Sequence, residues 1–536
     1  MLENALTNTN DNSDLKEKTV QLRQTLAELQ LKIRENKLPV IIIFEGWSAS
    51  GKGSLIGDLI KHLDPRFFKV YSTLPADSAQ MRYPMMKRFW ANIPEYGKMA
   101  VMDRSWYQEL AVACMEEDIS DKEYARRVKT VNEFERQLRN DGYLIIKFFL
   151  QISKEEQKRR FDKLRESSET KWRVTERDKK RHKLYDEYYK AFDDMLTRTD
   201  TPQAHWTVID TTDKTFAKYQ MFSTVANRIT SALDSPKVTF TSDKQYKLLP
   251  MPKLSDISLE NKTLSDENYA EQLKKCQKEL SKLHSRLYQA KIPMIIAFEG
   301  WDAAGKGGAI KRISSALDPR GYEAIPIAAP DKTELAHHYL WRFWNNIPKT
   351  GHIAIFDRTW YGRVMVERLE GFCSENDWMR AYNEINEFEK ELHDWGAVII
   401  KFWVQIDKDT QLERFNERQN TPEKQWKITD EDWRNRDKWD AYETAVNEMI
   451  QKTSTSYAPW HILESVDKKY ARIKALKIVV EELEKVLGER IILSQLSFQL
   501  INMFEFNDHH AKTDCKGQKV GNRSCIKYAH NAEKMR

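Results

Sequence analysis

Residues 298–310 read FEGWDAAGKGGAI, and an earlier copy at 44–56 reads FEGWSASGKGSLI. Each copy follows a short apolar run, PVIII or PMIIA, and leads into an amphipathic segment, which is the strand, loop and helix order of a phosphate-binding P-loop. Glycines let backbone N–H groups surround an anion at a helix N-terminus, and the lysine adds a positive charge. The alternative is a glycine turn that only ends a buried strand. The second loop contains Gly300, Gly305, Lys306 and Gly307.

Both loops lack one usual metal ligand. The Ser or Thr that normally follows the P-loop lysine and binds magnesium is replaced by Gly53 and Gly307. Another oxygen must therefore hold the metal. Asp302 is the candidate in the second loop, whereas the first loop has Ser48, and a neutral hydroxyl is a weaker ligand than a carboxylate for a hard cation.

The two loops belong to a long internal repeat. Matching residues at 46 and 300, at 103 and 357, and at 206 and 460 are all separated by 254 positions. A period of this length indicates two homologous domains in tandem. We predict a flexible N-terminal tail at 1–14, a first domain at 15–234, a linker at 235–266, a second domain at 267–488 and an unstructured C-terminal extension at 489–536.

Apolar strands alternate with helical stretches in each half. This order predicts an α/β fold of two tandem P-loop kinase-like domains, each with a parallel sheet flanked by helices. In such sheets, ligands bind at the carboxyl ends of the strands.

The composition restricts the class of protein. The chain has 536 residues, 40% of them hydrophobic, so it can bury two domain cores. Its formal net charge of +6 is too small to indicate nucleic acid. The five cysteines never occur in C-x-x-C spacing, and there is no signal peptide or apolar run long enough to span a membrane. We expect a soluble cytoplasmic protein that binds neither nucleic acid nor membrane.

Charged residues follow the later strands of the second half. Asp357 ends an apolar strand, as a Walker-B carboxylate does, although it could instead cap the next helix. Arg358 and Arg363 follow it. Arg414 and Arg418, at i and i+4, share one helix face. Arginines suit phosphoryl transfer because their planar fork grips phosphate oxygens, but a solvated helix face carries such pairs too. We predict that Arg363 and Arg414 bind phosphate.

Six ordered motifs resemble the polyphosphate kinase 2 family. They are EGWDAAGKGG, LDPRGY, AHHYLWRFWNNIP, FDRTWYGRVMVER, KFWVQIDKDTQLERFNER and QWKITDEDWRNRDKWDAYE. The resemblance covers some 220 residues of each half. The tandem arrangement resembles the two-domain branch of the family, the polyphosphate:AMP phosphotransferases. This resemblance implies that inorganic polyphosphate and Mg²⁺ are used to convert AMP to ADP.

The resemblance also implies roles for particular residues. Asp302 and Asp357 would hold magnesium, and Lys306 would bind phosphate. Arg358 and Arg418 would be the essential arginines. The segment 408–440 would be a helical lid that closes over the substrates.

Other functions are compatible with these residues. An ATP-dependent nucleoside monophosphate kinase has the same P-loop, Walker-B carboxylate and arginine-bearing lid. A polyphosphate:ADP phosphotransferase and a P-loop binding protein without turnover are further alternatives. The sequence leaves open the preferred nucleotide, the direction of the reaction and the oligomeric state, including a homo-oligomer.

The residues of the first half predict that it is a catalytically degraded copy of the second. Ser48, Gln108, Glu109 and Leu164 stand where the second half has Asp302, Gly362, Arg363 and Arg418. Lys52, Asp103 and Arg104 remain. The segment 147–186 holds 14 basic and 8 acidic residues, whereas the matching 401–440 holds 9 and 10. The first half would therefore either hold a polyanion or only support the second half by packing.

Overall fold

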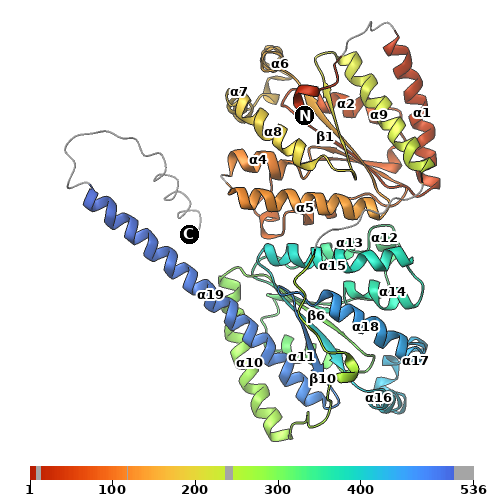
Figure 1. Cartoon of the computed structure of the whole chain (residues 1–536), viewed down its shortest axis with the longest axis vertical. Coiled ribbons are helices and arrows are strands. Elements are labelled where there is room, and N and C mark those ends of the chain that lie inside the picture. The colour runs from red at the N-terminus through yellow and green to blue at the C-terminus, as the bar shows by residue number, and fades with distance from the viewer. Residues whose placement is uncertain (8–13, 118, 236–244, 512–536) are drawn as a thin grey trace. The chain divides into compact units, whose positions relative to one another are not determined.

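The computed structural model describes residues 1–7, 14–117, 119–235 and 245–511, with the backbone alone described for Ala113 and residues 490–511. Contacts group Met1–Val479 into one compact unit and assign the residues from Val480 onward to another. Both sheets of the repeat lie in the first unit (Figure 1).

The first half is built on a five-stranded parallel sheet in the order β2-β3-β1-β4-β5. The strands are β1 Val40–Gly46, β2 Phe68–Ser72, β3 Met99–Asp103, β4 Leu144–Gln151 and β5 Trp206–Asp210. The helices are α1 Leu15–Glu35, α2 Lys52–Ile60, α3 Lys87–Trp90, α4 Gln108–Glu116, α5 Asp121–Asn140, α6 Lys154–Glu166, α7 Glu176–Lys183, α8 Tyr185–Thr199 and α9 Lys214–Asp234.

The second half repeats this sheet as β7-β8-β6-β9-β10. Its strands are β6 Met294–Gly300, β7 Tyr322–Pro326, β8 Ile353–Asp357, β9 Val398–Gln405 and β10 Trp460–Glu464. Its helices are α10 Asp266–Gln289, α11 Lys306–Ser314, α12 Lys332–Leu335, α13 Trp341–Asn345, α14 Val366–Leu369, α15 Glu375–Asp394, α16 Lys408–Asn420, α17 Asp430–Asp437, α18 Trp439–Thr453 and α19 Lys468–Ala511. The predicted fold class is confirmed.

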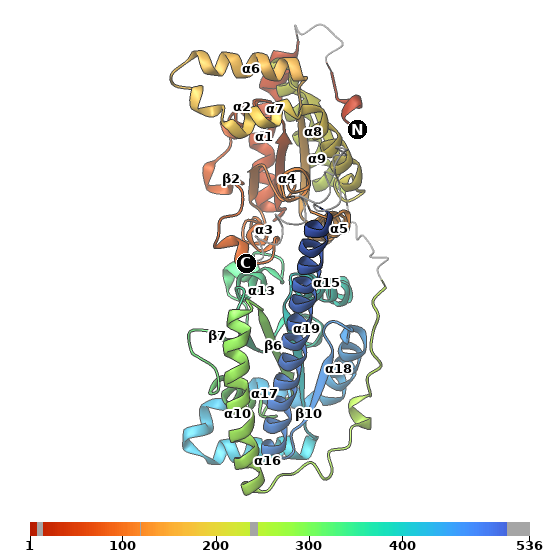
Figure 2. The ribbon, with the colours of Figure 1, turned by 90° about the vertical axis from the view of Figure 1, so that its left-hand side faces the viewer.

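Local sequence explains these elements. The central strands β1 and β6 are almost continuous runs of apolar residues, which suits strands covered on both faces by helices. Side-chain caps begin the long helices: the Ser120 and Ser374 hydroxyls accept hydrogen bonds from backbone N–H groups in the first turns of α5 and α15. In two views, α6 lies beside α7, and this helical pair occupies the first-half positions that match the lid predicted at 408–440 (Figures 1 and 2).

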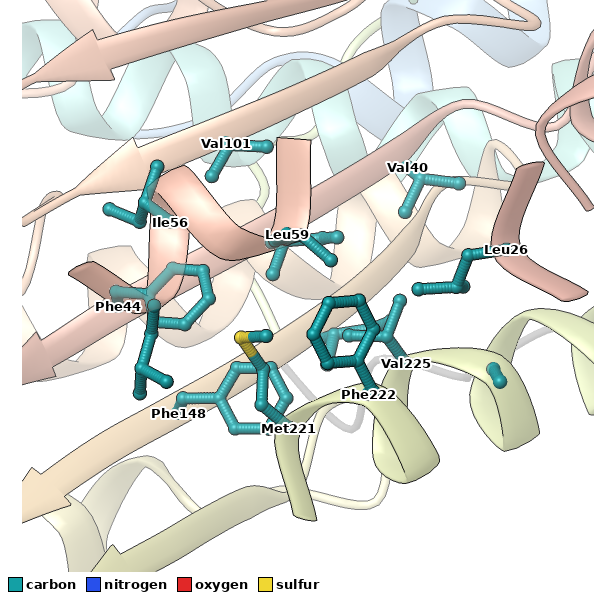
Figure 3. Packing of buried hydrophobic residues seen from close by; sticks show 14 of the residues in the cluster. Leu26, Val40, Phe44, Ile56, Leu59, Val101, Phe148, Met221, Phe222 and Val225 are labelled. Atoms are coloured by element: carbon teal, nitrogen blue, oxygen red, sulfur yellow. The ribbon is translucent and has the colours of Figure 1, made fainter. Parts of the chain in front are cut away.

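The first-half core lies between one sheet face and helices α1, α2 and α9. Phe44 and Phe148 from adjacent strands stack with ring centroids 5.3 Å apart, and Leu59 and Phe222 from the helices pack over them (Figure 3). All of these side chains are buried. Burial of a large apolar side chain contributes about 1.5–3 kcal/mol, so this cluster fixes the sheet under the P-loop.

A buried ion pair occurs at matching positions in both halves. Lys147 Nζ lies 2.9 Å from Glu135 Oε2, and Lys401 Nζ lies 2.8 Å from Glu389 Oε2, with all four side chains fully buried. Each lysine also donates to a tyrosine hydroxyl and to a backbone carbonyl. Because the pair persists in the half that has lost predicted catalytic residues, it belongs to the scaffold.

The two halves contact each other through equivalent surfaces within the first unit. Trp90 and Trp344 occupy matching positions, and their rings stack 5.8 Å apart at an interplanar angle of 14°. The Tyr96 N–H donates to the Ala336 carbonyl over 2.8 Å. The matching Thr350 N–H donates to the Arg82 carbonyl over 2.9 Å. This reciprocal pattern is that of a two-fold symmetric dimer interface, here formed inside one chain.

Two predictions about the chain ends are corrected. Residues 1–6 do not form a flexible tail: Leu2 is buried, Leu6 pairs with Ile209 of β5, and the Met1 ammonium lies 2.7 Å from Asp193. The two leucines supply the apolar contacts that a free tail would lack. The C-terminal extension is helical as far as Ala511, because α19 continues past the end of the repeat. The remaining predicted extension, 512–536, lies outside the described residues.

Among the described helices, none is long and apolar enough to cross a membrane.

Candidate active site

The two P-loops have the same backbone geometry. Gly51 and Gly305 precede α2 and α11 with φ of 103° and 114°, values that favour glycine. A Cβ on Gly300 would lie 2.6 Å from the Val404 carbonyl oxygen, so this position also requires glycine. Lys306 Nζ donates to the carbonyls of Gly300 and Trp301 over 2.6 and 3.2 Å. The loop is therefore a formed cradle at the start of a helix.

The Walker-B strand ends beside the second P-loop. β8 runs parallel to β6 and pairs Asp357 with Phe298, two residues before Gly300. Arg358 follows in a left-handed conformation, with φ of 67°, and its N–H donates to the Phe298 carbonyl. A non-glycine residue in this region costs of the order of 1 kcal/mol or more. The matching Arg104 adopts the same conformation, with φ of 64°, so it belongs to the shared backbone of the two halves. The strand end thus brings Asp357 and Arg358 to the loop.

Asp302 lies in a network of polar side chains. Its Oδ1 accepts a hydrogen bond from Arg358 Nη2 over 3.2 Å, and its Oδ2 accepts one from Asn435 Nδ2 over 2.9 Å. Asn435 belongs to α17, so this contact ties the lid to the P-loop. Burial and the Asp302 carboxylate raise the pKa of Asp432 on the same helix.

Arg358 is surrounded by carboxylates. Besides Asp302, its guanidinium faces Glu431 over 3.9 Å. Burial opposes its charge, but the carboxylates of Asp302, Glu299, Glu431 and Asp357 outweigh this effect and raise the pKa of Arg358. The arginine is half-exposed, so an incoming phosphate can reach it.

An open cleft adjoins these groups. A cavity of about 1510 Å³ has Arg358, Gly362, Arg363 and Arg434 in its lining. The Arg363 guanidinium lies 3.1 Å from Glu367 and 4.5 Å from the centre of the Tyr339 ring. Gly362 leaves the cleft open, because a Cβ there would meet only Val366, at 3.7 Å.

Arg414 has another role than the predicted one. It is buried, and its guanidinium donates to the carbonyls of Ala303, Ala304, Ser465 and Val466. The matching Arg160 donates likewise to Ala49, Ser50 and Thr211. Because these contacts recur in the first half and occupy the donors, Arg414 positions the P-loop rather than facing the cleft.

Arg418 is partly exposed and lies one turn after Arg414 on α16. Its Nη1 donates to the Lys427 carbonyl within the lid, and no contact with Asp357 occurs in the described part of the chain. Three tryptophans of the lid differ in their surroundings. Trp439 stacks on Trp301 at 3.7 Å and Trp433 packs against Phe415, whereas Trp426 is exposed.

The carboxylates fit a magnesium site that is only partly made of protein. The described residues contain no cluster of three or more His, Cys, Asp or Glu side chains suited to a metal. Mg²⁺ is usually held by one or two carboxylates, with waters and substrate phosphates as the other ligands. Asp302 and Asp357 could supply such a pair.

The first-half site differs in its contacts. The Ser48 hydroxyl donates to Asp178 over 2.6 Å. Gln108, in place of the open Gly362, donates to the buried Glu45 over 3.0 Å. Glu109 forms an ion pair with Arg88.

Sequence reasoning missed Asn435 and Glu431, which contact Asp302 and Arg358 from more than 70 residues away. Comparison of the halves contains a signal, since the matching positions hold Arg181 and Arg177. Such changes in charge accompany the replacement of Asp302 by Ser48.

The parallel sheets, the P-loops, the carboxylate ending the neighbouring strand and the arginine-bearing lid define a P-loop phosphotransferase class. The chain belongs to the polyphosphate kinase 2 family, whose family model matches residues 9–237 and 263–490.

Relatives match nearly the whole chain. A polyphosphate:AMP phosphotransferase of Pseudomonas aeruginosa is 38% identical over 90% of this chain and 99% of its own length. One from Acinetobacter johnsonii is 38% identical over 85% of this chain and 94% of its own length. A crystal structure from Pseudomonas aeruginosa PA01, assigned to polyphosphate kinase 2, matches with a TM-score of 0.80 and 36% identity over 91% of this chain and all of that one.

Proposed function

We propose that this protein transfers the terminal phosphoryl group of inorganic polyphosphate to AMP, giving ADP, and that the second half carries the reaction. One observation supports the second half above all: it alone combines the P-loop lysine with Asp302, Asp357 and Arg358 beside an open cleft. Relatives with matching domain content carry this activity in their names.

The reaction is an in-line displacement. An oxygen of the AMP α-phosphate attacks the terminal phosphorus of the chain, and the bridging oxygen leaves with the shortened polyphosphate. Because that nucleophile is already anionic, no covalent enzyme intermediate is required. The protein contributes positioning and charge neutralisation.

Each residue has a defined task in this proposal. Lys306 leaves the loop carbonyls and binds phosphate oxygens, together with backbone N–H groups of Gly305 and Gly307. Arg358 neutralises charge that spreads over the transferred group. Arg363 binds phosphate within the cleft. Arg418 reaches the phosphates when the lid closes and excludes water.

Magnesium would be held by Asp302 and Asp357 and would neutralise phosphate charge when bound. Arg358 and Asn435 now contact Asp302, so they would orient its carboxylate toward the metal or give way to it. Arg414 keeps the loop in place through its four carbonyl contacts.

A donor comparison tests the proposal. ADP formation from AMP should require polyphosphate and Mg²⁺ and should not occur with ATP as the donor. Activity with ATP alone would identify a nucleoside monophosphate kinase instead. ATP formation with ADP as the acceptor would identify a polyphosphate:ADP phosphotransferase. Absence of turnover with every combination of donor and acceptor would indicate a binding protein.

A further inference from the structure

The first half keeps a P-loop but surrounds it with different charges. In the second half, Arg358 has Asp302 and Glu431 beside it, and Asn435 binds the same Asp302 carboxylate. In the first half, Arg104 matches Arg358 and Ser48 matches Asp302. Arg177 matches Glu431, and Arg181 matches Asn435. These exchanges remove two carboxylates and add two cations. Around Arg104 the charge thus changes toward positive, whereas elsewhere in the first half Glu109 and Leu164 replace the cations Arg363 and Arg418.

Three cationic groups gather at this loop. Arg104 and Arg181 line a narrow cavity together with Ser48. Burial, Arg104 and Arg181 together lower the pKa of Lys52 to about 8, against the opposing effect of Asp103 and Glu45. The cations are therefore close enough to repel one another, and an anion bound between them would relieve this repulsion.

The loop also contains polar groups without partners among the described residues. Arg181 binds Glu116 through Nε, but its buried Nη2 has no hydrogen-bond partner. The Ser50 hydroxyl has none either, although Ser50 is only 1% exposed. A buried donor without a partner costs about 1–3 kcal/mol, so both groups favour a bound acceptor. The nearby Asp178 carboxylate accepts hydrogen bonds from Ser48 and Thr175.

We propose that the first-half P-loop is a metal-independent binding site for phosphate groups of an inorganic phosphate chain. The backbone N–H groups at the start of α2, Lys52, Arg104 and Arg181 supply the positive charge that magnesium supplies elsewhere. Ser48 removes the carboxylate that would attract a metal. The choice of a phosphate chain as ligand rests on the proposed function.

The cavity discriminates against nucleotides. Gln108, Tyr188 and Phe192 line it, and Gln108 stands where the second half has the open Gly362. With a volume of only about 20 Å³, the cavity between these walls leaves no room for a nucleoside. AMP should therefore bind the second half and not this site.

Isothermal titration of the full chain with tripolyphosphate in EDTA, at fixed ionic strength, tests the site. We expect one binding event per chain, because the second-half site depends on magnesium. Lys306→Ala should retain this event, whereas Lys52→Ala and Ser48→Asp should weaken it by roughly tenfold or more. Lys61→Ala, which removes an exposed lysine at the end of α2, is the charge-matched control and should bind as the wild type does.

Further titrations identify the ligand. Orthophosphate should compete with tripolyphosphate, and AMP should not. The proposal would be overturned if binding in EDTA survived both Lys52→Ala and Ser48→Asp, or if it disappeared in Lys306→Ala. Competition by AMP at the same affinity would also overturn it. If Lys52→Ala fails to fold, Ser48→Asp and Arg104→Gln decide, because both side chains are only partly buried. The readout is binding without metal, so a failed donor assay would not alter its outcome.

Discussion

Arg358 donates a hydrogen bond to Asp302 over 3.2 Å, and the first half has no counterpart of this pair because Ser48 replaces the aspartate. The pair joins the end of β8 to the P-loop, where charge develops during transfer. The second-half lid contacts the same carboxylate through Asn435. Loss of the aspartate thus removes the contact between strand and loop, whereas the first-half lid still contacts its loop, because the Ser48 hydroxyl donates to Asp178 of α7 over 2.6 Å.

Asp302→Asn should lower kcat by roughly 10³-fold in a folded chain, because it removes a charged group from a phosphoryl-transfer site. The amide keeps the shape of the side chain, and Asp302 is not part of the core, so the melting temperature should stay close to that of the wild type. Steady-state rates over a range of Mg²⁺ concentrations provide the measurement. A loss below tenfold, or full rescue without added metal, would contradict the role of Asp302.

Much of this site could be predicted because it is local in sequence. The P-loop and the carboxylate that ends β8 depend on spacing and on the carboxyl edge of a parallel sheet, both of which the sequence displays. The role of Arg414 could not be predicted in the same way. Its i, i+4 spacing with Arg418 gives a shared helix face, but it does not reveal that loop carbonyls more than 100 residues earlier meet that face.

The structure of the two chain ends could not be predicted from the sequence either. Leu2 is buried, and the Leu6 backbone pairs with the open edge of β5, which periodicity in a six-residue segment cannot reveal. The extent of α19 was missed because its sequence after the repeat lacks an amphipathic pattern.

Arg414→Lys and Arg160→Lys form a matched pair of variants. Lysine cannot reproduce the forked contacts with several carbonyls, so each variant should lower the melting temperature through unsatisfied loop carbonyls, at a cost of about 2–3 kcal/mol. Arg414→Lys should also lower kcat/KM by roughly 100-fold, because displacement of the catalytic loop by about 1 Å is enough for such a loss.

Arg160→Lys should leave kcat/KM nearly unchanged, because its loop lies in the half without Asp302. Thermal unfolding and steady-state kinetics on both variants give the comparison. Equal loss of kcat/KM in the two would show that the first-half loop takes part in the reaction.

Glu387→Gln should destabilise the contact between the halves. The Glu387 carboxylate is paired with Arg136 and accepts a hydrogen bond from Gln137 over 2.7 Å, and both members of the ion pair are at least nine-tenths buried. Removal of one partner leaves a buried charge unpaired, which typically costs about 3–5 kcal/mol. The melting temperature should therefore fall clearly.

Glu176→Gln breaks an exposed pair with Lys179 and is the control, since such pairs contribute little. Similar melting temperatures for the two variants would mean that the pair between the halves does not contribute to stability. Light scattering should accompany the measurement, because loosened halves would expose the surfaces around Trp90 and Trp344.

Glu391 on α15 should make stability depend on pH. Burial and the nearby Glu133 carboxylate raise the pKa of Glu391 to about 8, while Arg126 opposes them. In the unfolded chain the carboxyl ionises near its ordinary pKa of 4.5. Between these values the folded state binds more protons than the unfolded state, so stability falls as pH rises from about 4.5 to 8 and then levels off.

Glu391→Gln replaces the carboxyl with a neutral amide and should remove this dependence. The variant should therefore melt at a higher temperature than the wild type at pH 8.5 and at nearly the same temperature at pH 5. Paired thermal scans across this range, with Glu176→Gln as the control, provide the measurement. A difference that is constant with pH, or that grows toward low pH, would show that Glu391 is ionised in the folded protein and that Arg126 outweighs burial.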